Sequence, residues 1–487
     1  MTAAADTDEA DVVVVGAGLG GVVAAARAAQ LRRRVLLVEA RPTVGGTALY
    51  SGGGVHIWGA QTWDEYHAHC PQADPVLARR LFEQYVPFVE WAVSTKAPGR
   101  YRVTTLRGHT NAKYQLGRTI APHHRAAWFS YMVRLIERLG GAVRTGTRAT
   151  GLLQEDGRVR GVTVSTGSDE QTVRAGAVIL AAGGFQSEPA LMERYVGDGA
   201  IGADGRAVAE DVGDGLRLAL AAGGTTTRSM DTIYGHLMPV PPDWSDLLQP
   251  LLLTAFYAEH SIVVNGRGER FVDEGAGELN GETVNAAARQ AEGPLWIVMD
   301  ERVRRRHARY ELPYEMLTPT NLRYARLLRY FGVRLQGPRP VVTVDSLRYA
   351  ADHGAAVVRA PSLAALADEL AARGAARDAL LSTVAGFNEA VERGSAAQLP
   401  IPKTKEAYPI VEPPFTAVEV RPAASMTYGG VRIDEETRVL DEQDRPVKAL
   451  YAVPGTAGGI HRLHYGGALA ACAVYGKIAG EHAAAGV

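Results

Sequence analysis

Hydrophobic positions in the first forty residues form two apolar runs with an alanine-rich stretch between them. Residues 12–15, VVVV, are a β-branched run that is long enough for a buried parallel strand. The stretch VVAAARAAQL (22–31) predicts a helix, and RRRVLLVEA (32–40) predicts a second strand. The pattern therefore predicts a strand–helix–strand unit at the start of the chain.

Three glycines lie between the first predicted strand and the helix. Gly16, Gly18 and Gly21 form the pattern GxGxxG, and the acidic Glu39 ends the second strand. In a dinucleotide site the first glycine makes the tight turn, the second lets a pyrophosphate approach the backbone, and the third lets helix and strand pack closely. The acidic residue binds a ribose hydroxyl. A glycine-rich turn without a ligand is the alternative, but strand, helix, second strand and acid are all in register, which favours dinucleotide binding.

The segment after Glu39, ARPTVGGTALYSGGGVHIWGA (40–60), is rich in glycine. Gly45, Gly46 and Gly52 to Gly54 provide bare amides that can approach a phosphate or a flavin ring closely, which a nicotinamide enzyme would not need. The stretch resembles the flavoprotein family of fumarate reductase, 3-ketosteroid Δ1-dehydrogenase and tricarballylate dehydrogenase, and GGTALYSGGG is most similar to the ketosteroid dehydrogenase form. Covalent-flavin members carry a histidine where Gly46 stands, so the resemblance implies noncovalent FAD.

The resemblance extends over most of the chain. VILAAGGFQ (178–186) is similar to the family's second dinucleotide contact, and GDGLRLALAAGG (213–224) is similar to its Gly-Asp-Gly helix start. Residues 429–459 resemble the hairpin and strand that return the chain to the flavin, although Pro454 and Gly455 replace a Gly-Glu or Gly-Asn of many relatives. The segment GGALAACAVYGKIAGEHAA resembles the final helix, whose N-terminus points at the flavin pyrimidine edge. The residues that we expect to contact FAD are Gly16, Gly18, Gly21, Glu39, Gly45, Gly46, Thr47, Ser51, Gly52, Gly53, Ala149, Ala182, Gly183, Asp214, Gly455, Ala468 and Leu469.

The composition changes between Met230 and Tyr408, where proline, arginine and aromatic residues increase. PSLAALADELAARGAARDALLSTVAGFNEAVERG (361–394) then reads as two helices, the first starting at Pro361-Ser362. This region resembles the family's capping domain. We therefore expect an α/β fold, with a Rossmann-like FAD-binding domain at 1–231 and 409–487, an inserted α+β capping domain at 232–408, and an active site between cap and flavin.

Composition and charge exclude several other classes. The net charge of −1 gives no argument for nucleic acid, and Cys70 and Cys472 are far apart without a CxxC, so neither a disulfide framework nor a metal site is expected. The small, acidic N-terminus is unlike a signal peptide, and no apolar run approaches the roughly 20 residues of a membrane span. We expect a cytoplasmic protein that binds neither nucleic acid nor membrane.

The segment GERFVDEGAGE (268–278) resembles the lead-in to the family's proton-transferring residue. In fumarate reductases an arginine follows the Arg-Phe-x-x-Glu motif by four residues and delivers a proton, and in ketosteroid dehydrogenases a tyrosine there removes one. Four residues after Glu274 stands Glu278. A carboxylate can act as general acid or base, more so where burial raises its pKa. The alternative is a glycine-rich surface loop in which Glu278 is only solvated.

The remaining fumarate reductase positions argue against a dicarboxylate substrate. His236 matches the family's first substrate-binding histidine, but Met426 stands in place of the second. His464 or Tyr465 stands near the place of the C-terminal arginine, and Arg462 is displaced. Fumarate or succinate would lack its bidentate cationic partners and would face an acidic residue. Both substrates are therefore disfavoured.

Tyrosines offer another chemistry. Ketosteroid dehydrogenases polarise a ketone with a C-terminal tyrosine and a backbone N–H, and Tyr465 with the glycines behind it matches that pair. Tyr428, beside another Gly-Gly, is a second donor. Either tyrosine could instead be a packed aromatic residue, and His236 and His464 could be buried structural groups. Our candidate catalytic residues are Glu278, Tyr465, Tyr428, His236 and His464.

These residues predict an FAD-dependent dehydrogenase that desaturates a C–C bond next to a carbonyl in a neutral, cyclic or steroid-like substrate. Glu278 would take the α-proton, Tyr465 would hold the enolate, and the β-hydride would pass to flavin N5. The first alternative is an ene-reductase that runs the reverse reaction with an external electron donor. A C–N or C–O oxidising flavoenzyme and a non-catalytic electron-carrying flavoprotein are further alternatives. The small-molecule substrate and the electron acceptor or donor are not identified by the sequence.

Overall fold

The structure is a computed structural model that describes residues 9–57, 62–106, 109–117, 122–199, 206–240, 253–276, 281–290, 293–313, 331–336 and 339–487. The chain forms two compact units. Unit 1 comprises Met1–Leu191, Ala207–Tyr234 and Ser425–Val487, and unit 2 comprises Met192–Arg206 and Gly235–Ala424. The chain passes between the units within α5 (Pro189–Tyr195), β10 (Ile233–Pro239) and β17 (Phe415–Thr427). The division into domains at 231 and 408 stays a prediction.

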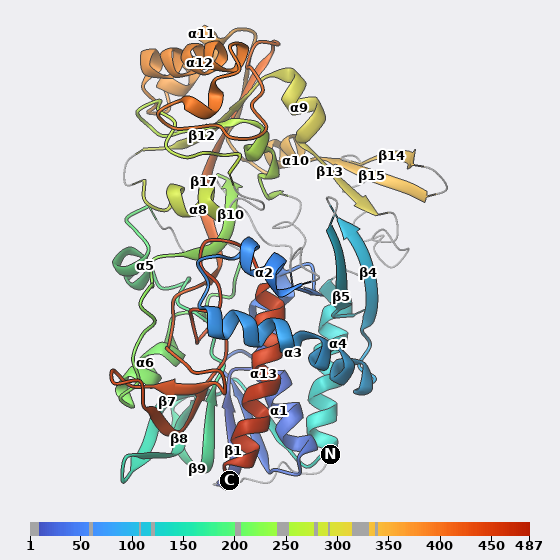
Figure 1. Ribbon diagram of the computed structural model, residues 1–487, viewed down its shortest axis with the longest axis vertical. Helices are drawn as coiled ribbons and strands as arrows, with labels where there is room; N and C mark the ends of the chain where they lie inside the picture. The colour runs from blue at the N-terminus through green and yellow to red at the C-terminus, as the bar shows by residue number, and fades with distance from the viewer. Residues whose placement is uncertain are drawn as a thin grey trace. The chain divides into compact units, whose positions relative to one another are not determined.

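The main sheet of unit 1 has the strand order β18-β19-β8-β9-β1-β2-β6, with β7 paired to β8. Figure 1 labels β1, β7, β8 and β9 of this sheet. Its strands are β1 (Glu9–Val15), β2 (Val35–Glu39), β6 (Ala142–Thr145), β7 (Arg148–Glu155), β8 (Arg158–Thr166), β9 (Asp169–Leu180), β18 (Arg438–Leu440) and β19 (Pro446–Ala452). β1 runs parallel to both β2 and β9, with Val13 opposite Leu36 and Val178. The strand–helix–strand prediction is confirmed by β1, α1 (Leu19–Gln30) and β2.

Helices complete unit 1. The helices and short helical turns are α1, α2 (Trp63–His69), α3 (Pro75–Ser94), α4 (Pro122–Arg138), α6 (Asp214–Ala221), α13 (Ala468–Ala485) and η1 (Gly46–Tyr50). A small antiparallel sheet contains β3 (Gly54–Val55), β5 (His109–Gln115) and β4 (Arg100–Leu106). α1 packs against both α13 and α4, so β1 is covered and its valines are fully buried. Burial on both faces explains why β1 reads as an unbroken apolar run.

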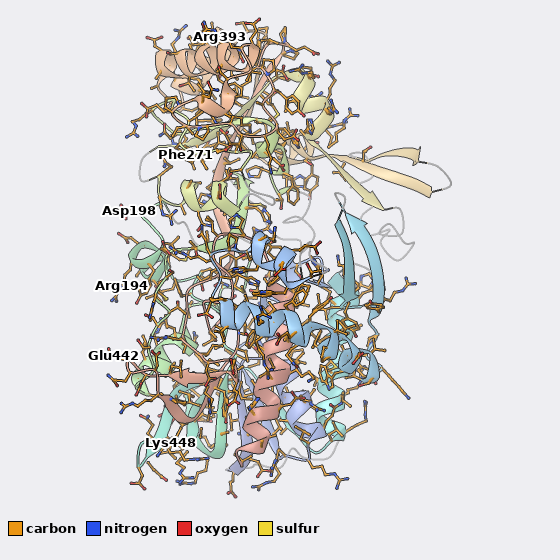
Figure 2. The ribbon with its side chains drawn as sticks, viewed as in Figure 1. Arg194, Asp198, Phe271, Arg393, Glu442 and Lys448 are labelled. Carbon is orange, nitrogen blue, oxygen red and sulfur yellow. The ribbon has the colours of Figure 1, made fainter. Side chains whose placement is uncertain are left out.

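Unit 2 contains a sheet of order β10-β17-β12-β11 with β16 paired to β17, and a three-stranded sheet β13-β15-β14. The additional strands are β11 (Ile262–Val264), β12 (Leu295–Met299), β13 (Arg309–Pro313), β14 (Phe331–Gln336), β15 (Arg339–Asp345) and β16 (Val357–Ala360). The helices are η2 (Phe256–His260), α8 (Gly281–Ala287), α9 (Glu301–His307), α10 (Ser346–Asp352), α11 (Leu363–Ala371), α12 (Arg377–Glu392) and η6 (Ala396–Gln398). Figure 2 shows the side chains of both units.

One of the core clusters of unit 2 lies between its sheet and two helices. α11 and α12 confirm the helix pair predicted at 361–394, and Ser362 caps α11 by accepting a hydrogen bond from the Ala365 amide at 3.1 Å. Leu366 and Phe387 from these helices join Trp296 of β12 in one buried cluster. Among the described residues, no helix has both the length and the apolar character that crossing a membrane requires.

Candidate functional site

The turn between β1 and α1 explains the three glycines of the fingerprint. A side-chain carbon added at Gly16, where φ is +100°, would lie 2.3 Å from the Ala181 carbonyl oxygen, and one added at Gly21 would lie 1.9 Å from the Gly16 carbonyl oxygen. A carbon added at Gly18 would meet nothing within 4 Å. Gly16 and Gly21 are thus required by backbone packing, whereas Gly18 leaves open space beside the start of α1. That space fits the pyrophosphate of a dinucleotide.

Glu39 is held at the end of β2 by two backbone amides. The Ala17 amide donates to Glu39 Oε2 at 2.7 Å, and the Arg41 amide donates to Oε1 at 2.9 Å. Burial raises the pKa of the Glu39 carboxyl, and the two amides oppose that shift. The carboxylate is thereby fixed beside the glycine turn, where it can accept a hydrogen bond from a ribose hydroxyl.

The glycine-rich loop lies against the same turn. The Gly45 amide donates to the Ala17 carbonyl oxygen at 2.9 Å, and a carbon added at Gly46 would contact only Gly18, at 3.4 Å. Ser51 Oγ donates to the Ala48 carbonyl oxygen at 2.7 Å and accepts from the Gly53 amide at 3.0 Å, which closes the short helix η1. The structure therefore brings the loop glycines and the fingerprint together around one space.

Asp211 is a buried carboxylate in this region that the sequence did not single out. Thr47 Oγ1 and Gln186 Nε2 each donate to Asp211 Oδ2 at 2.6 Å. Burial raises the pKa of Asp211 to about 7, and the negative charges of Glu39 and Glu210 add to this shift. Asp211 joins the flavin loop to the turn at Gly183 and Gln186, and no local pattern marks it because both partners are distant in sequence.

The second glycine turn meets the C-terminal segment. A carbon added at Gly455, where φ is +100°, would lie 3.3 Å from the Gly183 Cα, and Thr456 Oγ1 donates to the Gly183 carbonyl oxygen at 3.0 Å. Ala182 lies beside Gly16. Gly467 precedes α13, whose first turn holds the predicted contacts Ala468 and Leu469 and carries no acidic residue. A helix start of this kind favours negative charge on a bound group.

Two of the residues that we expected to contact FAD, Asp214 and Ala149, are next to Arg148 in the structure. Asp214 begins α6 and accepts a hydrogen bond from Arg148 Nε at 2.7 Å. Ala149, the neighbour of Arg148 on β7, is buried. Gly52 is open, since an added carbon would meet nothing within 4 Å. All cofactor contacts named in the sequence analysis remain predictions, and the open glycines with the amide-bound Glu39 fit FAD.

Three tyrosines of unit 1 pack together close to the start of α13. The rings of Tyr234 and Tyr465 stack with centroids 4.4 Å apart, and Tyr428 lies 6.4 Å from Tyr234. Burial raises the pKa of Tyr428 and of Tyr465 well above the ordinary value, so both hydroxyls stay protonated at neutral pH. The Tyr428 hydroxyl donates to the His464 carbonyl oxygen at 3.4 Å. The sequence analysis missed Tyr234, which lies far from the other two in sequence.

The other candidate residues, His464, His236 and Glu278, lie in different parts of the chain. His464 lies in unit 1, with its ring 6.3 Å from that of His69. His236 lies in unit 2 on β10, 5.3 Å from the ring of Phe256, and burial lowers its pKa well below the ordinary value, so it is neutral. Arg462 contacts Asp231 at 3.4 Å. Glu278 lies outside the described residues.

The lead-in to residue 278 is fastened inside unit 2. Arg270 donates to both carboxylate oxygens of Glu274, at 3.1 and 2.6 Å, and the Val263 amide donates to the same carboxylate at 2.8 Å. Lys403 Nζ lies 3.6 Å from Glu274 and donates to the Ser261 carbonyl oxygen at 3.0 Å. The Arg and Glu of the Arg-Phe-x-x-Glu motif are therefore a buried ion pair rather than substrate-binding groups of the described structure.

Within the described ranges, no group of three or more His, Cys, Asp and Glu residues could hold a metal ion. Cys70 and Cys472 are both free thiols, and burial raises the pKa of each to about 12.

Comparison with known proteins places these features in a family. Residues 11–469 match the family described as FAD binding domain. The chain is 26% identical over 516 residues to fumarate reductase (cytochrome) of Shewanella frigidimarina, covering 99% of this chain and 78% of that protein. It is 24% identical over 503 residues to vinyl phenol reductase of Lactiplantibacillus plantarum, covering 98% and 97%.

A solved structure shares the fold. The crystal structure of 3-ketosteroid Δ1-dehydrogenase from Sterolibacterium denitrificans superposes with a TM-score of 0.73 at 21% identity, covering 98% of this chain and 100% of that chain. The α/β fold with a capping domain that the sequence predicted is confirmed by this likeness. Because the family match spans nearly the whole chain, this protein belongs to the FAD binding domain family, and it is an FAD-dependent oxidoreductase of the kind that includes fumarate reductases and ketosteroid dehydrogenases.

Proposed function

We propose that this protein desaturates a C–C bond next to a carbonyl group in a neutral, cyclic or steroid-like substrate. The observation that carries the proposal is the packing of three tyrosines: the ring centroids of Tyr234 and Tyr465 are 4.4 Å apart, and those of Tyr234 and Tyr428 are 6.4 Å apart. Tyr465 lies just before α13. An aromatic surface with protonated hydroxyls suits an uncharged ketone better than a dicarboxylate. FAD, when bound, supplies the hydride acceptor.

Two positions that bind the dicarboxylate in fumarate reductases also favour an uncharged substrate here. Met426 occupies the position at which fumarate reductases carry a second histidine. Arg462, the nearest arginine to the C-terminal position, lies 3.4 Å from the carboxylate of Asp231, which already offsets its charge. A dicarboxylate would therefore lose the bidentate arginine contacts that make its binding strong.

We assign two roles to residues of the chain. Glu278 removes the acidic proton α to the carbonyl, and Tyr465 donates a hydrogen bond to the developing enolate oxygen. Glu278 follows the motif residue Glu274 by four positions, and the buried pair of Glu274 with Arg270 fixes the start of that segment within unit 2. Tyr428 and the two histidines His236 and His464 are secondary candidates for substrate contact. Noncovalent attachment of FAD, on the evidence of Gly46, also belongs to the proposal.

Anaerobic stopped-flow mixing with 3-ketosteroids and other cyclic ketones tests the reaction, because reduction bleaches the flavin absorbance. With an accepted ketone we expect Glu278→Gln to slow bleaching by about 10²- to 10⁴-fold and Tyr465→Phe by about 10²-fold. Glu269→Gln and Tyr451→Phe are matched controls: Glu269 is an exposed acid of the same segment, and Tyr451 lies on β19. If Glu278→Gln bleached the flavin as fast as the wild type, the base assignment would fail.

A second candidate function is the reverse reaction, reduction of an activated alkene with electrons from an external donor. The similarity to vinyl phenol reductase over almost the full length of both chains favours it, since the substrate in that name is an uncharged aromatic alkene. Titrating the chemically reduced protein with enones and vinyl phenols under anaerobic conditions separates the two directions. Reoxidation by these alkenes, without bleaching of oxidised protein by any ketone, would replace dehydrogenation with reduction.

A further inference from the structure

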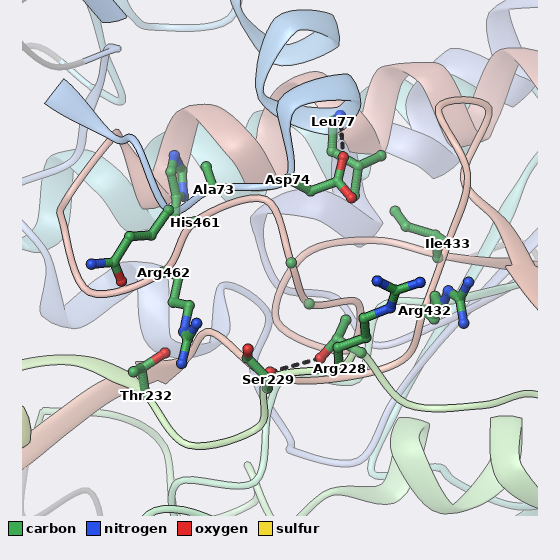
Figure 3. A pocket seen from close by; sticks show the side chains of 14 residues that line it. Ala73, Asp74, Leu77, Arg228, Ser229, Thr232, Arg432, Ile433, His461 and Arg462 are labelled. Atoms are coloured by element: carbon green, nitrogen blue, oxygen red, sulfur yellow. Dashed lines mark hydrogen bonds between the residues drawn. The ribbon is translucent and has the colours of Figure 1, made fainter. Parts of the chain in front are cut away.

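A cavity of about 350 Å³ lies in unit 1, apart from the predicted FAD contacts. Four segments form its wall: the turn before α3 and its first residues (72–77), residues 227–232, residues 432–433 and residues 458–462 (Figure 3). None of the residues that line it belongs to the glycine fingerprint, the flavin loop or the start of α13. The volume is within the range of small-molecule sites.

The charged residues of this cavity are mostly arginines. Arg228, Arg432 and Arg462 line it together with a single carboxylate, Asp74. Asp74 caps α3 by accepting hydrogen bonds from the Val76 and Leu77 amides, so its charge is partly engaged by the helix start. His461 is buried with its pKa lowered to about 3, so it adds no positive charge. Arg432 and Arg462 each contact a carboxylate that is not among the lining residues, Asp444 and Asp231, so Arg228 is the lining arginine without a described ion pair.

Several donors of the wall are not satisfied by the protein. Within the described part of the chain, the Arg228 guanidinium makes no hydrogen bond or ion pair, and Figure 3 shows it beside the cavity with Arg432. The hydroxyl of Thr232 is buried without a partner among the described residues, although the residue is only 3% exposed. The buried Nε of Arg462 also lacks a described partner. The Thr232 hydroxyl and the Arg462 Nε are buried, and buried polar groups are nearly always paired, so these two donors favour a ligand that accepts hydrogen bonds. Arg228 is exposed, so water can satisfy its guanidinium when no ligand is bound.

We propose that this cavity binds a small phosphate-bearing molecule. A phosphate monoester carries close to two negative charges at neutral pH, which Arg228 can meet directly and which Arg432 and Arg462 can meet when they release their carboxylates. Its oxygens match the planar donor fork of arginine, and three arginines from separate segments can each reach a different oxygen. The Thr232 hydroxyl supplies a further donor. Arg432 and Arg462 now contact Asp444 and Asp231, both partly exposed, which a dianion can displace at modest cost.

The phosphate proposal does not rest on the proposed reaction, so its test uses binding to protein loaded with FAD. Isothermal titration with glycerol 3-phosphate and with inorganic phosphate, at constant ionic strength, should give saturable binding to the wild type. We expect Arg228→Gln to weaken binding by about tenfold and Thr232→Val to weaken it several-fold. Arg160→Gln, which changes an exposed arginine on β8, is the matched control and should leave the affinity unchanged.

Two further binding experiments test which chemical class of ligand the cavity takes. Succinate tests a dicarboxylate of the same charge and should bind more weakly than glycerol 3-phosphate. Vesicles containing phosphatidic acid test whether the phosphate is carried on a lipid, since only a lipid headgroup site would retain the protein on them. The proposal is overturned by an absence of saturable binding to the wild type, by equal affinity of Arg228→Gln, by the same loss in Arg160→Gln, or by tighter binding of succinate. Flavin absorbance in each variant confirms that unit 1 remains folded.

Discussion

Replacing Glu274 with glutamine is expected to destabilise unit 2 strongly. Glu274 is fully buried, and its carboxylate lies between the guanidinium of Arg270 and the ammonium of Lys403, whose side chains are 5% and 0% exposed. The substitution preserves the shape and one oxygen for the Val263 amide, which donates to it at 2.8 Å. It removes the negative charge that contacts both buried cations.

The size of the destabilisation depends on the buried charges that remain after Glu274 is replaced. Removing one partner of a buried ion pair costs about 3–5 kcal/mol because the other charge is left uncompensated. Here two cations remain, and burial already lowers the pKa of Lys403 with Glu274 present. Lys403 can respond by losing its proton, but Arg270 cannot. We therefore expect the full range of about 3–5 kcal/mol and a fall of roughly 10 °C in the unfolding temperature of unit 2.

The assay should report on unit 2 alone, because a chain of two units need not unfold in one step. Urea-dependent hydrogen exchange of peptides from β11 and β12 meets this need, since β11 contains the Val263 amide. Glu269→Gln is the matched control: Glu269 contacts Arg267 at 3.1 Å on the surface, and its loss should cost less than about 1 kcal/mol. Equal effects of the two substitutions would refute the view that the motif is a buried structural anchor.

Two further predictions concern unit 1 and the flavin. Because burial raises the pKa of Asp211 from 3.8 to about 7, the folded protein holds this proton more tightly than the unfolded chain; the stabilisation is complete below about pH 4 and is lost as pH rises to about 7. Asp211→Asn should therefore raise the melting temperature of the protein more at pH 8 than at pH 5, and an equal change at both pH values would contradict the assignment. Acid precipitation should release all of the flavin into the supernatant, since Gly46 stands where covalent members carry histidine; flavin in the pellet would exclude noncovalent attachment.

The glycine fingerprint was predictable because each residue acts through its own backbone. Gly16, Gly18 and Gly21 are set by the geometry of one turn, and Glu39 follows at the end of the next strand, so spacing alone carries the information. Strand and helix periodicity likewise predicted β1, α1 and β2. The family resemblance then extended the prediction to the inserted cap, where Ser362 also marks the start of α11.

Asp211 and Tyr234 could not be predicted in the same way. Asp211 stands out only through its hydrogen bond with Thr47, which lies 164 residues away in sequence, and through its burial. No local sequence pattern reveals either feature. Tyr234 becomes part of the tyrosine cluster only because it stacks on Tyr465, which is distant in sequence. Contacts of this kind depend on tertiary packing, and a single sequence contains no signal for them.

The anchor at Arg270 and Glu274 explains how one family can vary the residue four positions later. Among the described residues, Arg270 and Glu274 pair with each other, and Lys403 and the Val263 amide complete the contacts of the Glu274 carboxylate. We expect a change at 278 to leave this anchor intact, because the described contacts already satisfy the Glu274 carboxylate. It follows that the two glutamates should separate by experiment: Glu278→Gln should lower the rate without lowering the stability of unit 2, and Glu274→Gln should lower the stability first. A loss of stability in both would mean that Glu278 is part of the same structural network and would remove the main reason to treat it as a base.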